Sequence, residues 1–231
     1  MKALALSLLV LATATSGVLA EIPDRPEKLS FPALTYEPPK PADYRVQLKA
    51  GPVAYIATDR ALPLVTISVM VRCGAYLEPE GKEGLADFTG HLLVRGGIAS
   101  KTAEELEERL AFLAAGLSSG IGDDSGSVSL NLLSKDLPEG LALLREALTA
   151  PRFQKDKFDL HREQSIQGMK QRNDDSGSIQ SMEAERLAYG TNFWASRIST
   201  EKSLKSLSVD DLKAYHQEMV PPRQLRRLRV R

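Results

Sequence analysis

Two residues in the first half of the chain have the types and the spacing of a metal site. Asp87 and His91 are four residues apart in a segment that predicts a helix over 85–94, so their side chains lie on one helical face. Carboxylates and imidazoles both bind zinc. A catalytic zinc site also needs a third ligand and a group that takes a proton from the bound water. Two ligands alone therefore predict a weak metal site.

The other residues with reactive side chains are isolated from one another. Cys73 is the only cysteine and ends the apolar run 64–71, so we expect a buried residue and no internal disulfide. His161 and His216 fall on other predicted helices among charged neighbours, and we expect both to be solvated. The acidic pair 174–175 precedes Ser-Gly and indicates a helix end and loop rather than a catalytic pair of carboxylates.

The elements that would position these residues are segregated along the chain. Helices and strands that are grouped, and not strictly alternating, favour an α+β fold with helices packed on one face of a mainly antiparallel sheet. Strands are predicted over 44–48, 53–58 and 64–71, and a hairpin over 117–121 and 127–133. Helices are predicted over 85–94, 137–150, 155–173 and 179–189, with two more starting at the capping patterns of Thr102 and Ser208.

The two ends of the chain differ in composition from its middle. Residues 1–20 have one lysine, a short apolar stretch and small residues before Glu21, which predicts a secretory signal peptide cut after Ala20. The apolar run is too short for a membrane span, so we expect an exported protein, periplasmic or secreted, with no membrane span after cleavage. Residues 21–43 contain six prolines and predict an extended arm.

The charge balance excludes one class of partner. Thirty lysines and arginines match thirty aspartates and glutamates, so no global field attracts nucleic acid, and we expect no nucleic-acid partner. The only basic patch is the tail 223–231, which holds five arginines.

The clearest resemblance to a known family lies in residues 73–91, which read Cys-Gly-Ala-Tyr-Leu-Glu-Pro-Glu-Gly-Lys-Glu-Gly-Leu-Ala-Asp-Phe-Thr-Gly-His. This segment resembles the pitrilysin/insulinase family of zinc peptidases, in which Gly-Leu-Ala leads into a helix with the inverted zinc motif H-x-x-E-H. The resemblance covers roughly 44–222 and implies the zinc-peptidase-like α+β domain of that family. Because it stops abruptly at Pro222, we interpret the tail as a truncation or frameshift product.

The resemblance implies the fold of the family, but the residues of its zinc site are only partly present. It places Asp87 at the first histidine, Gly90 at the glutamate and His91 at the second histidine, so H-x-x-E-H reads D-x-x-G-H and the general base is missing. The family's third ligand falls on Gly168. We therefore expect no catalytic residues and no cofactor, and an inactive homologue. The alternative is an active zinc metalloendopeptidase whose altered site uses Asp87 and His91.

The family also implies a role that needs no catalysis. Its active members bind peptide by adding it to the edge of the strand after the second helix. Ser118, Ser119 and Gly120 occupy that position, although small polar residues are equally typical of an ordinary edge strand. The resemblance thus implies a peptide-binding or partner subunit, which binds unfolded polypeptide and pairs with a catalytic family member as a hetero-oligomer.

Overall fold

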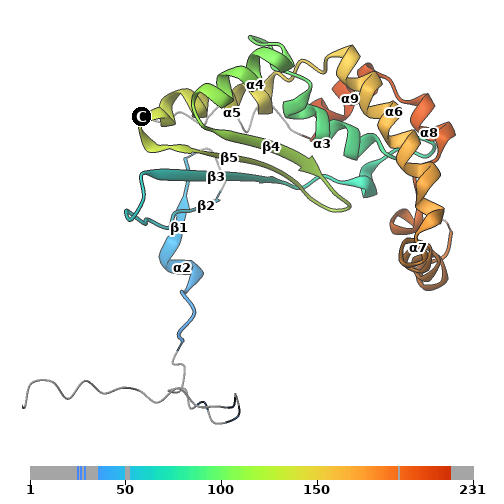
Figure 1. Ribbon diagram of the computed structural model, residues 1–231, viewed down its shortest axis with the longest axis horizontal. Helices are drawn as coiled ribbons and strands as arrows, with labels where there is room; N and C mark the ends of the chain where they lie inside the picture. The colour runs from blue at the N-terminus through green and yellow to red at the C-terminus, as the bar shows by residue number, and fades with distance from the viewer. Residues whose placement is uncertain are drawn as a thin grey trace, which may run out of the picture. The chain divides into compact units, whose positions relative to one another are not determined.

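The structure is a computed structural model that describes residues 36–49, 53–191 and 193–219, together with Arg25, Glu27 and Leu29 (Figure 1). Two units are distinguished, residues 1–43 and 44–231, and the short helix α2 (Pro41–Tyr44) lies at their boundary. The predicted signal peptide, most of the predicted arm and the basic tail fall outside the described residues. The sections below concern the second unit.

The strands of the second unit form two antiparallel sheets. β1 (Arg45–Gln47) pairs with β2 (Val53–Tyr55), which confirms two of the predicted strands in shorter form. The larger sheet has the order β3-β5-β4, formed by β3 (Leu64–Val71), β4 (Gly116–Ile121) and β5 (Gly126–Leu133). The predicted hairpin is β4–β5, with Leu117 opposite Leu130.

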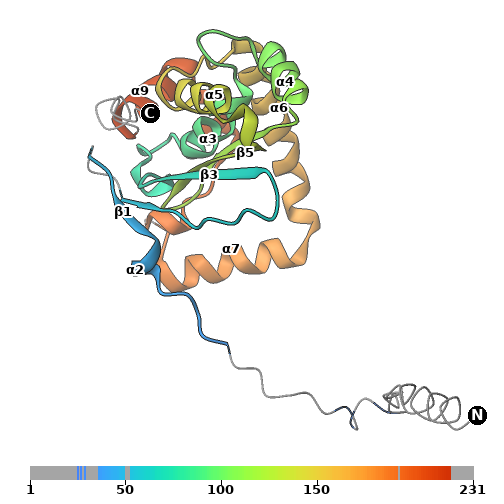
Figure 2. The ribbon, with the colours of Figure 1, turned by 90° about the vertical axis from the view of Figure 1, so that its left-hand side faces the viewer.

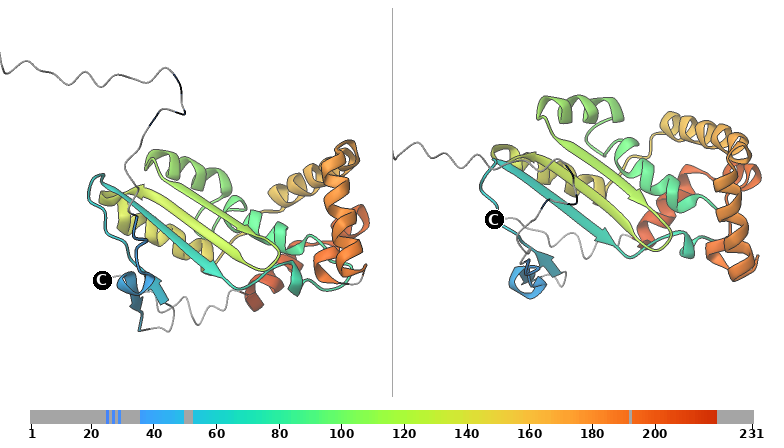
Figure 3. Two further views of the ribbon diagram at one scale, coloured as in Figure 1. Left: turned by 90° about the horizontal axis from the view of Figure 1, so that it is seen from below. Right: turned by 60° about the horizontal axis from the view of Figure 1, so that its bottom comes forward.

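The larger sheet has one apolar and one polar face, because side chains alternate along a strand. Val128, Leu130 and Leu132 of β5 are buried, whereas Ser127 and Asn131, which alternate with them, are exposed. Helices lie on the apolar face (Figures 1 and 3). The predicted layer arrangement of an α+β fold is confirmed.

The helices that cover the sheet surround α3 (Leu85–Arg95), eight of whose residues are buried. The capping box predicted at Thr102 is present, with both of its hydrogen bonds to Glu105. Figure 2 shows α7 (Ser176–Tyr189) running crosswise to α6 (Lys155–Gln171). The other α-helices are α4 (Ala103–Phe112), α5 (Leu137–Thr149), α6 (Lys155–Gln171), α7 (Ser176–Tyr189), α8 (Glu201–Ser206) and α9 (Val209–Met219), and the 3₁₀ helices are η2 (Ala75–Leu77), η3 (Ser134–Asp136), η4 (Arg172–Asp174) and η5 (Trp194–Ser196).

Two histidines are less exposed to solvent than the sequence predicts. His216 is 5% exposed, and its Nε2 lies 3.0 Å from the carbonyl oxygen of Leu148, so the expectation of a solvated side chain is wrong. Burial lowers the pKa of His216. The side chain of His161 is 14% exposed and packs against α3, so it is not solvated either. Cys73 is buried as predicted, and burial raises the pKa of its thiol.

Candidate functional site

The first turn of α3 is held by a buried carboxylate. Glu78 accepts hydrogen bonds from the backbone N–H groups of Gly84, at 3.2 Å, and Ala86, at 2.7 Å. These donors belong to the start of the helix, where backbone N–H groups have no partner within the helix. Burial raises the pKa of Glu78. Glu78 thereby fixes the turn that carries Asp87.

Three polar side chains meet where α3 packs against α6. Asp87 Oδ2 lies 3.3 Å from Nε2 of His161, and the rings of His161 and His91 stack at 3.8 Å between centroids with planes 6° apart. Phe88 lies against the same ring of His161, at 4.5 Å between centroids. Asp87 is 70% exposed, so the cluster opens to solvent on its side.

The environment of His91 favours its neutral form. Burial, the largest cause, and the neighbouring His161 and Arg95 together lower the pKa of His91 to about 4, while Asp87 opposes them. A neutral imidazole is the form that binds metal, so protonation state alone does not exclude a metal here.

The arrangement of the cluster does not fit a zinc ion. A ring nitrogen binds metal along a lone pair in the plane of its ring, and the stacked rings of His91 and His161 lie in nearly parallel planes, so one ion cannot lie in the planes of both rings. Within the described residues no group of three or more His, Cys, Asp or Glu side chains is placed to hold a metal ion. Metal binding by Asp87 and His91 stays a prediction.

Position 90, where the family motif has its glutamate, is in close contact with β4. A Cβ atom at Gly90 would lie 2.2 Å from the backbone nitrogen of Ile121 and 2.8 Å from the carbonyl carbon of Gly120. The hydroxyl of Ser119 donates a 2.6 Å hydrogen bond to the carbonyl oxygen of Gly90. Glycine is thus what allows β4 to approach α3 this closely.

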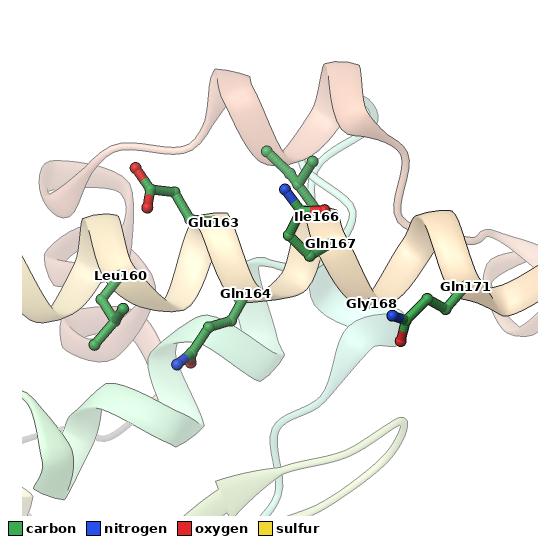
Figure 4. A pocket seen from close by; sticks show the side chains of 7 residues that line it. All are labelled: Leu160, Glu163, Gln164, Ile166, Gln167, Gly168 and Gln171. Atoms are coloured by element: carbon green, nitrogen blue, oxygen red, sulfur yellow. The ribbon is translucent and has the colours of Figure 1, made fainter.

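Position 168, where the family has its third ligand and this chain has a glycine, has an open environment. A Cβ at Gly168 would meet no atom within 4 Å, and the residue lines a groove along α6 (Figure 4). The α6 residue that reaches Asp87 and His91 is His161, two turns earlier. Sequence reasoning missed it, yet Phe158 gave a signal: this buried residue lies three positions before His161 and so on the same face.

A cavity of about 540 Å³ lies beside the histidine pair. It is bounded by α3, α4, the start of β4 and α6. His91 and His161 line it, together with the charged residues Arg95, Glu107 and Lys157, of which Lys157 is paired with Glu104. Its apolar lining is Leu92, Val94, Leu106, Leu110, Ala111, Ala115, Leu117 and Leu160. A cavity that combines apolar side chains with convergent polar groups is the usual form of a ligand site.

The edge of β4 that faces away from β5 has no strand partner among the described residues. Gly122 N–H bonds to Ser125 O at the turn, and hydrogen-bonded pairs alternate along an antiparallel ladder. Ser118 and Gly120 therefore pair with β5, and the main-chain groups of Leu117 and Ser119 face the free edge. Of the predicted substrate-binding residues, Ser118 and Gly120 expose their outer face, whereas Ser119 bonds to Gly90.

Comparison with known proteins gives one family and a group of solved structures. Residues 54–220 match the model of the insulinase family, peptidase family M16. Among curated proteins nothing matches. Similar solved structures include an inactive M16 peptidase domain from Pseudomonas fluorescens, with 24% identity, a TM-score of 0.67, and 74% of this chain and 42% of that one covered.

Two further structures extend the comparison to whole proteases. The periplasmic protease PqqL from Escherichia coli has 12% identity and a TM-score of 0.66, over 78% of this chain and 20% of that one. A ferredoxin protease in complex with Arabidopsis ferredoxin has 18% identity and a TM-score of 0.64, over 86% of this chain and 24% of that one. The chain spans less than half the length of each of these relatives. No helix in the described part of the chain is long and apolar enough to cross a membrane.

Proposed function

The chain belongs to the insulinase family, peptidase family M16, and we propose that it is a non-catalytic member that binds extended polypeptide at the free edge of β4. The observation that carries the proposal is the contact between Gly90 and β4. A general base at position 90 would need side-chain atoms where the backbone of Ile121 and Gly120 already lies. The packing of α3 against the sheet therefore requires a residue without a side chain at position 90, where a base would have to be.

Peptide binding needs only groups that this site retains. Leu117 and Ser119 present N–H and C=O groups on an unpaired edge, and an added strand satisfies them by main-chain hydrogen bonds that tolerate any sequence. Alternate side chains of that strand would face the helix layer, where the cavity beside Leu117 can receive an apolar one. At the other end of the edge, α3 covers Ile121 through Gly90.

The partner and the location belong to the same proposal. We propose a catalytic family member as hetero-oligomer partner, because it would supply the general base that position 90 lacks. The pattern of residues 1–20 and a relative described as periplasmic support export to the periplasm or the medium. Cell fractionation with amino-terminal sequencing of the mature protein tests this part.

The alternative, an active zinc endopeptidase with an altered site, has less support. It would need Asp87 and His91 to bind zinc with a third ligand and a base, and the stacked imidazoles do not converge on one point. We propose that no zinc is bound in the purified protein.

A pair of substitutions at Ser119 tests the edge. Ser119→Pro removes one free-edge N–H and the hydroxyl, whereas Ser119→Ala removes the hydroxyl alone. With a fluorescent six-residue peptide that alternates serine and valine, we expect affinity at least about tenfold weaker for the proline variant than for the alanine variant. Equal affinities in two variants with the same circular dichroism would contradict binding at this edge.

A further inference from the structure

The cavity beside the histidine pair lies at the amino end of β4. Gly116 and Leu117, the first two residues of the strand, line it, and α4 packs beside this end of the strand (Figure 1). Side chains of α3, α4 and α6 form the other walls. A polypeptide on the free edge of β4 therefore meets a walled cavity at one of its ends.

The direction of the added strand decides which end this is. β4 pairs with β5 in antiparallel fashion, and antiparallel pairing is also the slightly more stable arrangement for a strand on the free edge. An antiparallel ligand runs from Ile121 toward Gly116, so its carboxyl end arrives at the cavity. Residues directly opposite each other point to the same face of a sheet, so the ligand side chain opposite Leu117 points into the helix layer.

The α3 wall of the cavity carries a cation that the fold leaves unpaired. Arg95 is exposed, and in the described part of the chain it forms no hydrogen bond or ion pair. It lies one turn after His91, on the same face of α3. Asp87, the carboxylate of this helix, is eight positions before Arg95, about 12 Å along the axis, and contacts His161 instead. Arg95 is therefore available to an anion in the cavity.

The charged groups on the opposite wall interact with one another. Lys157 Nζ lies 2.6 Å from Oε1 of Glu104. This hydrogen bond is the main cause that raises the pKa of Lys157, and the charge of Glu107, which lines the cavity, adds to it. Two carboxylates thus share one lysine where α4 faces α6, and this wall attracts no further anion. The place for a ligand carboxylate is beside Arg95.

A chain end has both features that these walls select. Its last residue carries a carboxylate and a side chain on one Cα atom, and an arginine binds a carboxylate through two parallel N–H donors. An internal apolar residue lacks the charge, and an acidic side chain lacks the apolar surface. The part of the cavity between α3 and α4 is apolar, with Leu92, Leu106, Leu110 and Ala111.

We propose that the cavity at the amino end of β4 binds the carboxyl-terminal residue of a polypeptide, with the apolar side chain of that residue between α3 and α4 and its carboxylate on Arg95. The proposal rests on the peptide binding proposed at β4. It names the substrate class of that site: polypeptides that end in an apolar residue with a free carboxylate.

The test changes the end of the peptide and the charge at position 95. The serine–valine peptide, labelled at its amino end and ending in valine, is compared by fluorescence anisotropy with the same peptide ending in a carboxamide. We expect the free carboxylate to bind at least about tenfold more tightly. Arg95→Gln should abolish this difference, whereas Arg145→Gln, which removes the same charge from an exposed position on α5, should keep it. Glutamine favours helix, so both variants should fold.

Two further peptides separate binding of a chain end from general attraction. A carboxamide peptide with glutamate at its amino end has the same net charge as the carboxylate peptide and should show no gain. A carboxylate peptide that ends in serine should bind at least about tenfold more weakly than the one that ends in valine.

The pattern of results distinguishes the two proposals. If carboxylate and carboxamide peptides bind equally, if the amino-terminal glutamate gives the same gain, if terminal serine and valine bind equally, or if Arg95→Gln behaves as Arg145→Gln, chain-end binding is refuted while the β4 site stands. If no peptide binds, both proposals fail.

Discussion

The same substitution, glycine to alanine, has opposite effects at two positions in this structure. Gly90 lies inside α3 and Gly168 inside α6, so alanine gains up to about 1 kcal/mol of helix propensity at each. At Gly168 the new methyl group meets nothing within 4 Å. Gly168→Ala is therefore expected to raise the free energy of unfolding by about 0.5–1 kcal/mol.

At Gly90 the added methyl group meets backbone. The nitrogen of Ile121 would lie 2.2 Å away, and backbone atoms cannot turn aside as a side-chain rotamer can. Overpacking costs about 1–3 kcal/mol, and moving β4 strains the hydrogen bond of Ser119, which is worth about 1 kcal/mol. After the helix gain is subtracted, we expect Gly90→Ala to lower the free energy of unfolding by about 2 kcal/mol.

Urea unfolding followed by circular dichroism measures both variants against the parent. The expected difference between the two is about 3 kcal/mol, with similar m-values. If Gly90→Ala is as stable as Gly168→Ala, β4 does not press against α3 at this point. The packing argument against a base at position 90 would then be refuted.

Two further predictions concern the groups around α3. Glu78→Ala leaves the N–H groups of Gly84 and Ala86 without their carboxylate partner. It should lower the free energy of unfolding, measured by urea titration, by about 2 kcal/mol. Glu80 is exposed, so the control Glu80→Ala should change this free energy little. Because the folded state lowers the pKa of His91 to about 4 from 6.5, the unfolded chain binds the proton first, so stability should fall as pH drops from about 6.5 to 4. His91→Phe should make this fall smaller, and the buried His216, whose pKa is also lowered, should account for the part that is left. A parent profile that is flat over this range, or unchanged in His91→Phe, would contradict the burial of His91.

The local patterns of the sequence predict the elements well. The hairpin was readable because alternation in Ser127–Leu133 follows a polar turn, and α3 because its apolar spacing ends at two glycines. The placement of Asp87 and His91 on one helical face follows from their spacing alone. The pairing of strands is a long-range property, so the sequence did not indicate that β1 and β2 form a sheet of their own, apart from β3.

The candidate site depends on contacts between helices, which spacing within one helix cannot give. His161 is 70 residues after His91, and its charged neighbours in the sequence indicated a solvated side chain. In the structure His161 lies on the same face of α6 as the buried Phe158, and this face packs against α3. His216 was misjudged for the same reason, because its partner is a carbonyl group of another helix, α5. The tight contact at Gly90 depends on β4, which is also distant in sequence.

The central claim is that this member of a peptidase family binds polypeptide without cleaving it. One experiment tests it directly: purified protein with bound zinc measured by mass spectrometry is mixed with a fluorescence-quenched peptide of twelve residues, and anisotropy and cleavage are followed together. We predict saturable binding with no cleavage, no stoichiometric zinc and no effect of a chelator. Cleavage that stops on chelation and returns with zinc would contradict the account.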